Sequence, residues 1–101
     1  MATNVFTVVA KLYPKAGRED ELQAILVEQA AAVRKAEPDC LAYRVHRSAK
    51  SPTVFLFYEQ YRSKEAFDLH RTAPHLAPFQ ARRKGLVDER VEVEFYTALT
   101  A

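Results

Sequence analysis

The chain has 101 residues, of which 49% are hydrophobic, and a formal net charge of +2. That length suits one small domain with a single core, so we expect residues 1–101 to form one domain. Acidic and basic residues are interspersed without a basic tail or stripe, which excludes an electrostatic nucleic-acid binder. The lone cysteine, Cys40, excludes a disulfide framework and a cysteine-based zinc site.

The sequence carries no sign of export or of membrane insertion. Its first residues, MATNVFTVVAK, lack the basic segment and the long apolar stretch of a secretory signal. No apolar run approaches the ~20 residues that an α-helix needs to span a bilayer. We therefore expect a cytoplasmic protein that does not associate with membranes.

The first half of the chain predicts three strands and one long helix. Residues 5–13, VFTVVAKLY, are β-branched and aromatic, which predicts the first strand. Residues 18–36 place apolar side chains at helical spacing after an acidic first turn, and Pro38 ends that helix. Residues 40–48 and 53–61 read as strands on either side of a Pro-containing turn, which predicts a hairpin. In the first of them, alternation predicts Leu41, Tyr43 and Val45 on one face.

The second half predicts two short helical pieces and a last strand. Ser63 is expected to cap the first piece, which carries Glu65 in its first turn. A second piece spans roughly 73–84 and ends at Gly85. Residues 90–99 alternate apolar and acidic side chains, as a strand does. The order β-α-β-β-α-β at this length predicts a ferredoxin-like (split βαβ) α+β fold, an antiparallel sheet with helices on one face.

Two of the predicted strands, 5–13 and 53–61, are apolar on both faces. Helices cover only one face of such a sheet, and the rest of the chain supplies no cover for the other face. A second copy of the sheet is the simplest cover. We therefore expect a homodimer whose sheets pack face to face.

The segment from the third strand onward carries a pattern of aromatic residues and histidines. It reads Phe-x-x-Tyr-Glu-x-Tyr over 55–61, then Ala66-Phe67, His70-x-Thr72-x-Pro74-His75 and Phe79. On these residues the chain resembles the antibiotic biosynthesis monooxygenase (ABM) domain family. Within that family it is most similar to the small bacterial quinol-monooxygenase and autoinducer-2-phosphate-processing branch. The resemblance implies a dimeric α/β barrel with a cavity between sheet and helices in each subunit. Oxygenase members use neither metal nor flavin, so no cofactor is implied.

The two histidines of this pattern are the main candidates for chemistry. Phe67 is a natural core anchor, and His70 shares its helix face, so the His70 ring should point toward the sheet. The ring could simply pack there with its nitrogens bonded to backbone; the resemblance favours a cavity histidine that binds or deprotonates substrate. His75 could be a second cavity residue, a local cap or a surface side chain. As metal ligands the pair is a thin set, because no cysteine and no well-placed carboxylate accompanies it.

Tyrosines and phenylalanines complete the predicted site. Tyr58 and Tyr61 lie on opposite faces of their strand, and Glu59 shares the face of Tyr61. We expect Glu59 to pair with a nearby cation. The predicted catalytic residues are His70, His75 and Tyr58, and the predicted substrate-binding residues are Tyr61, Phe57, Phe67 and Phe79.

The function that fits these residues best is a cofactor-independent monooxygenase, which oxidises a quinol or an anthrone-like phenol with O2. In this hypothesis His70 is the base, and Tyr58 and His75 are orienting donors. One alternative is an isomerase or lyase acting on a small phosphorylated carbonyl compound, with Arg71 or Arg82 facing the cavity. The other is a non-catalytic dimeric barrel that binds a small molecule, with its histidines pointing away from the cavity.

Overall fold

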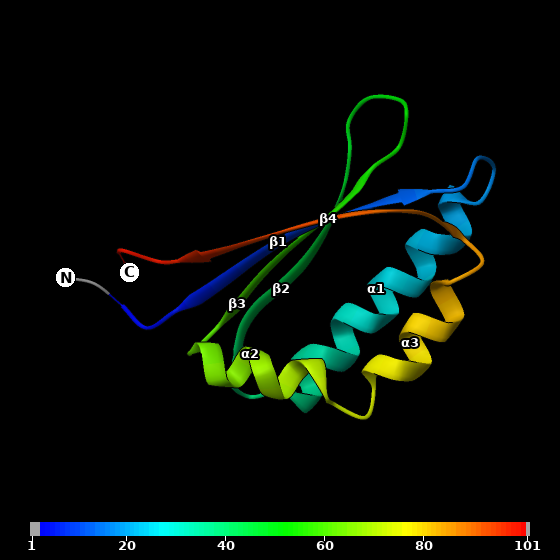
Figure 1. Cartoon of the computed structure of the whole chain (residues 1–101). Helices are drawn as coiled ribbons and strands as arrows, with labels where there is room; N and C mark the ends of the chain where they lie inside the picture. Colours follow the sequence, from blue (N-terminus) through cyan, green and yellow to red (C-terminus); the bar gives the residue numbers. More distant parts are fainter. Residues whose placement is uncertain (1–2, 101) are drawn as a thin grey trace.

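The computed structural model describes residues 3–100, apart from the side chain of residue 89. Its elements in chain order are β1 (Phe6–Pro14), α1 (Glu19–Ala36), β2 (Cys40–Arg47), β3 (Phe55–Tyr61), α2 (Lys64–Arg71), α3 (Leu76–Arg83) and β4 (Val87–Thr97). The four strands form one antiparallel sheet in the order β2-β3-β1-β4. The helices lie on one side of this sheet, with α1 and α3 side by side (Figure 1). The predicted ferredoxin-like α+β architecture is confirmed.

Helix α1 forms because its sequence meets the requirements of a helix at both ends and along one face. Three acidic residues occupy its first turn and two basic residues its last, which complements the helix dipole. The turn before it contains Gly17 at φ 82°, a left-handed conformation that glycine adopts without strain. One stripe of α1 faces the sheet and is buried; its members are Leu22, Leu26, Gln29 and Val33. The predicted helix is therefore confirmed to within one residue at its start.

The face of the sheet toward the helices holds the core. Alternate residues of β1 and β3 point to it, and those that are buried are Val8, Leu12, Phe55, Phe57, Glu59 and Tyr61. In β2 a register shift between Cys40 and Ala42 breaks the alternation. Cys40 and Tyr43 are both buried as a result, while Leu41 is 39% exposed. The expectation that Leu41 shares the buried face of Tyr43 is wrong, because a bulge inserts one residue into the strand.

The two short helices after β3 are separate, as predicted. Ser63 caps α2, and its hydroxyl accepts a hydrogen bond from the Ala66 N–H at 3.2 Å. The segment between α2 and α3 contains Pro74, and His75 stands at the N-cap of α3. Strand β4 begins at Val87, a few residues before the predicted start. Within residues 3–100, no helix is both long and apolar enough to cross a membrane.

Candidate active site

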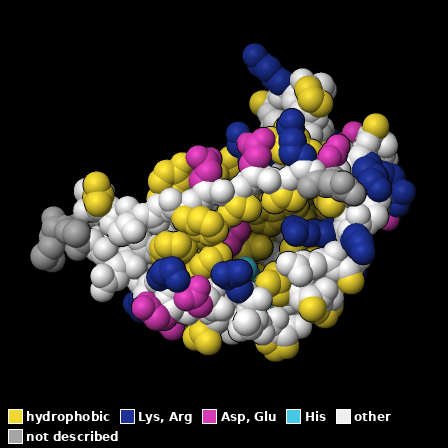
Figure 2. Space-filling view, viewed as in Figure 1, with side chains coloured by type: hydrophobic (Ala, Val, Ile, Leu, Met, Phe, Trp, Pro, Cys, Tyr) yellow, Lys and Arg dark blue, Asp and Glu magenta, His cyan; other side chains and the backbone are white. Residues whose placement is uncertain are grey.

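A cavity of about 170 Å³ lies between the helix-facing side of the sheet and helices α2 and α3. Most of its lining is hydrophobic and comprises Val8, Ala10, Leu12, Tyr43, Phe57, Phe67, Leu76, Phe79, Val91 and Val93. Figure 2 shows the hollow between sheet and helices, with yellow apolar side chains around a few charged ones. Val91 and Val93, on the edge strand β4, are each 46% exposed, so the cavity opens along that edge. An apolar hollow with a few polar groups is the usual form of a small-molecule site.

Glu59 is the buried acid of this cavity. It lies on β3, is 6% exposed and accepts a hydrogen bond at 2.6 Å from the hydroxyl of Tyr61. Burial raises the pKa of Glu59, and the Tyr61 hydrogen bond opposes part of that rise. Its expected pairing with a cation is wrong, because no lysine or arginine in the described part of the chain lies within ion-pair distance of it. Burial and the neighbouring Glu59 also raise the pKa of Tyr61, so its phenol stays protonated and can donate.

His70 enters the cavity from the last turn of α2. Its ring is 7% exposed and lies among the aromatic rings of Tyr61, Tyr43 and Phe67, at centroid distances of 5.2, 5.8 and 6.2 Å. Nδ1 of His70 lies 2.8 and 3.0 Å from the two carboxylate oxygens of Glu37. A carboxylate only accepts hydrogen bonds, so Nδ1 carries a hydrogen; in the neutral tautomer that this selects, Nε2 has the lone pair.

The orientation of His70 leaves Nε2 available to a ligand. Among residues 3–100 no protein group bonds to this nitrogen, and the ring lines the cavity. A carboxylate on one imidazole nitrogen with the other nitrogen facing a ligand site is the arrangement that orients a general base. The interpretation of His70 as a packed ring bonded only to backbone is therefore wrong, since its partner is a carboxylate.

Glu37 is a candidate functional residue that sequence reasoning missed. Pro38 disfavours a helical conformation in the residue before it, so α1 ends and Glu37 leaves it with extended backbone at φ −120° and ψ 91°. This exit carries the Glu37 carboxylate toward α2 and α3. Its Oε2 is 2.5 Å from Nε2 of His75 as well as 2.8 Å from Nδ1 of His70. The expectation that no well-placed carboxylate accompanies the histidines is wrong.

The structure does not bring every predicted residue into the cavity. Tyr58 pairs in register with Val9 and points to the face of the sheet opposite the helices, so it does not join His70. The prediction that Tyr58 acts beside His70 is wrong for this cavity, because α2 holds His70 over one face of the sheet and Tyr58 lies on the other. His75 bonds to Glu37 and is not part of the lining. Tyr61 reaches the site through Glu59, whereas the three predicted phenylalanines line it directly: Phe57, Phe67 and Phe79.

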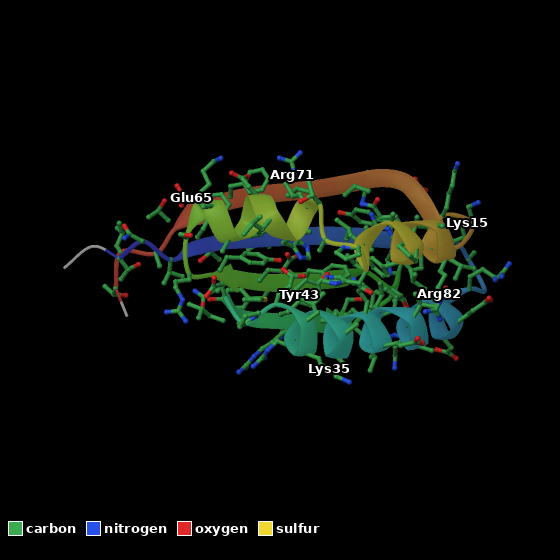
Figure 3. The ribbon with its side chains drawn as sticks, turned by 90° about the horizontal axis from the view of Figure 1, so that it is seen from below. Lys15, Lys35, Tyr43, Glu65, Arg71 and Arg82 are labelled. Atoms are coloured by element: carbon green, nitrogen blue, oxygen red, sulfur yellow. The ribbon has the colours of Figure 1, made fainter. Side chains whose placement is uncertain are left out.

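Two arginines line the cavity, and one of them was not predicted. Arg71 lines the cavity, as the isomerase or lyase alternative allowed. Arg82 does not; it makes a bidentate ion pair with Glu28 on α1, at 3.0 and 3.1 Å. Figure 3 shows Arg82 on the side of α3 that faces α1. Arg83 lines the cavity in its place and packs its guanidinium 5.1 Å from the ring centroid of Phe79. Burial lowers the pKa of Arg83, although a guanidinium remains charged at neutral pH.

The family assignment follows from comparison with known proteins. The sequence model of the antibiotic biosynthesis monooxygenase family matches residues 5–82. The chain belongs to the ABM family. Rv0793 of Mycobacterium tuberculosis is 33% identical over 91 residues, which cover 90% of this chain and 88% of that protein. Membership supports a monooxygenase-like function, the activity for which the family is named.

Solved structures of similar proteins agree with the fold. The structure of Rv0793 superposes with a TM-score of 0.84 at 29% identity and covers 96% of this chain and 97% of that one. A protein of Caulobacter crescentus superposes with a TM-score of 0.91 at 24% identity, over 97% of this chain and 92% of that one. PA3566 of Pseudomonas aeruginosa gives 0.85 at 24% identity, over 99% of each chain. The last two likenesses show the fold alone.

Proposed function

We propose that this ABM protein is a cofactor-independent monooxygenase that oxidises a quinol or another electron-rich phenol with O2. The observation that carries the proposal is His70, whose Nδ1 is held by Glu37, whose Nε2 has no protein partner among residues 3–100, and whose ring lines an apolar cavity. Nε2 is placed to take the phenolic proton of a bound substrate. The resulting phenolate is electron-rich enough to reduce O2 directly.

The overall reaction balances without an external reductant. For a hydroquinone, the ring loses two hydrogens and gains one oxygen atom, which gives a hydroxyquinone; the second oxygen atom leaves as water. The protein then supplies a base, a hydrogen-bond donor and a dry cavity. Tyr43 is the donor that the geometry favours, since it lines the cavity and burial raises the pKa of its phenol, which keeps it protonated. In this scheme His75 is a positioning residue that acts through Glu37.

Oxygen uptake tests the proposal. Purified, chelator-treated protein is assayed with a panel of hydroquinones and anthrones, beside the His70→Ala and His46→Ala variants. If His70 is the base, its removal should slow uptake at least ~10²-fold. His46 is an exposed residue of β2 on the opposite sheet face, so His46→Ala is the matched control and should keep the full rate. No uptake by folded protein across the panel, or an unchanged rate in His70→Ala, would refute the proposal.

A second function is favoured by the two arginines of the cavity. Arg71 and Arg83 could bind a phosphate group while His70 moves a proton on a small carbonyl compound, which describes an isomerase or lyase. This reaction consumes no oxygen. Turnover of a phosphorylated carbonyl compound under nitrogen, lost in Arg83→Gln, would support this function over the oxygenase.

We also propose that a second copy of the chain covers the outer face of the sheet. Val9, Leu56 and Tyr58 are half-buried on that face, among polar neighbours. Light scattering on the purified chain should give twice the monomer mass, and Leu56→Glu should reduce it to the monomer mass. A monomeric wild-type chain at micromolar concentration would refute this part of the proposal.

A further inference from the structure

Glu37, His70 and His75 bring three metal-ligating groups to one point. They come from the end of α1, the last turn of α2 and the N-cap of α3. A carboxylate oxygen and two imidazole nitrogens lie within 4.8 Å of one another. Their side chains are 13%, 7% and 18% exposed, so all three are largely withdrawn from water.

We propose that this cluster binds a divalent transition-metal ion such as Zn²⁺ beside the substrate cavity. Two histidines and one glutamate are a known ligand set for zinc, with the remaining positions left to water. Imidazole and carboxylate also suit cobalt and other first-row divalent ions. The three groups already converge on one small volume, and both histidines direct a ring nitrogen at the same carboxylate oxygen.

The distances are close to those that an ion requires. At metal–ligand distances of about 2.1 Å, neighbouring ligand atoms lie about 3.0 Å apart in octahedral geometry and about 3.4 Å apart in tetrahedral geometry. The His70–Glu37 and His75–Glu37 contacts are 2.8 and 2.5 Å. Each must therefore lengthen by less than about 1 Å to admit an ion in place of its hydrogen-bonding proton. The ligand nitrogens of His70 and His75 lie within 4.8 Å of each other, so the two rings must also approach each other to share an ion.

A second hollow of about 270 Å³ offers an ion an approach to Glu37 outside the substrate cavity, with which it shares no lining residue among residues 3–100. It is lined by the α1–β2 connection and by α2. Its lining is Ala36, Glu37, Pro38, Asp39, Cys40, Ala66 and Leu69.

Metal binding has a consequence for the cavity, which rests on the proposed function. An ion on Nδ1 of His70 takes the position that the hydrogen holds in the metal-free protein. The hydrogen of the neutral imidazole then resides on Nε2, the nitrogen that faces the substrate. Nε2 becomes a donor and no longer accepts a proton. We therefore expect a bound ion to stop oxygen uptake without occupying the cavity.

Titration calorimetry tests the site without any turnover. Untagged, chelator-treated protein is titrated with Zn²⁺, and with Co²⁺ to record its visible absorption spectrum. We expect one ion per chain and at least tenfold weaker binding in His75→Ala and in Glu37→Gln. His46→Ala, which removes the one histidine outside the cluster, should bind as the wild type does. Circular dichroism of each variant checks that it folds. If Glu37→Gln does not fold, His75→Ala, which changes a partly exposed residue, still tests the metal site.

The outcomes separate the site from the proposed function. Absence of binding in the calorimeter, or undiminished binding in both His75→Ala and His70→Ala, would overturn the metal site. One ion per chain together with Zn²⁺-dependent loss of oxygen uptake supports both steps. One ion per chain with unchanged uptake would overturn the effect on His70 and leave the site standing. Protein that binds Zn²⁺ but oxidises no substrate refutes the oxygenase alone.

Discussion

Glu59 offers the sharpest test of how the cavity is built, because its burial couples stability to pH. Burial raises the pKa of Glu59 in the folded protein above its value in the unfolded chain, ~4.3. The folded state therefore holds the proton more tightly. The stability that this provides is fully present below the unfolded-state pKa and is lost as pH rises through the folded-state pKa. Glu59→Gln keeps the shape and an acceptor for Tyr61 but cannot ionise.

The expected size of the pH dependence follows from the single proton that the Glu59 carboxyl binds or releases. Within the window between the two pKa values, the wild type should lose up to about 1.4 kcal/mol of unfolding free energy per pH unit relative to Glu59→Gln. Urea denaturation of both proteins from pH 4 to 8, at one fixed protein concentration, measures this difference. Glu59→Gln should be nearly neutral at pH 4 and increasingly stabilising toward pH 8, as the wild-type carboxyl ionises in its buried position.

The chain contains its own control for this experiment. Tyr96 donates to Glu94 at 2.8 Å, with the same two-residue spacing as the Tyr61–Glu59 pair, but on the exposed side of β4. Glu94→Gln should leave the pH dependence of stability unchanged. We argue that burial disfavours the ionised form of Glu59. That conclusion would be refuted if the unfolding free energies of the wild type and of Glu59→Gln changed in parallel over the whole pH range.

Three further predictions concern single residues. Burial raises the pKa of the Cys40 thiol to about 12, so a disulfide reagent at pH 8 should modify it far more slowly in folded than in urea-unfolded protein. Ser63→Ala removes the cap of α2 and should lower the unfolding free energy by about 1 kcal/mol in a urea titration. Phe55 has 0% exposure, so Phe55→Ala should cost ~3–5 kcal/mol, and Phe95→Ala, at a residue 54% exposed, should cost clearly less.

The fold could be predicted from the sequence where local pattern determines structure. The β-branched run of β1, the apolar stripe of α1 and the Ser63 cap each follow from residues a few positions apart. Leu41 shows where that reasoning fails. The bulge after Cys40 has no local sequence signature, and a shift of one residue moves every later side chain of β2 to the opposite face.

The candidate site could be predicted only in part, for a related reason. The spacing of Phe67 and His70 along one helix correctly predicted that His70 faces the sheet. Alternation correctly separated Tyr58 from Tyr61, but it could not say which of the two faces the helices cover. Glu37 contacts His70 across 33 positions, so its role depends on how the end of α1 packs against α2. Only the break imposed by Pro38 marks that position in the sequence.

The contact between Glu37 and His70 connects the proposed oxidation chemistry to the proposed metal site. Nδ1 of His70 has one bonding position, which either a hydrogen or a metal ion can occupy. With the hydrogen there, Glu37 fixes the tautomer and Nε2 can accept a proton from the cavity. With an ion there, Nε2 carries the hydrogen and the base is lost. His75 acts only through Glu37 in the first state but is itself a ligand in the second, so metal binding gives its close contact with the same carboxylate a direct role.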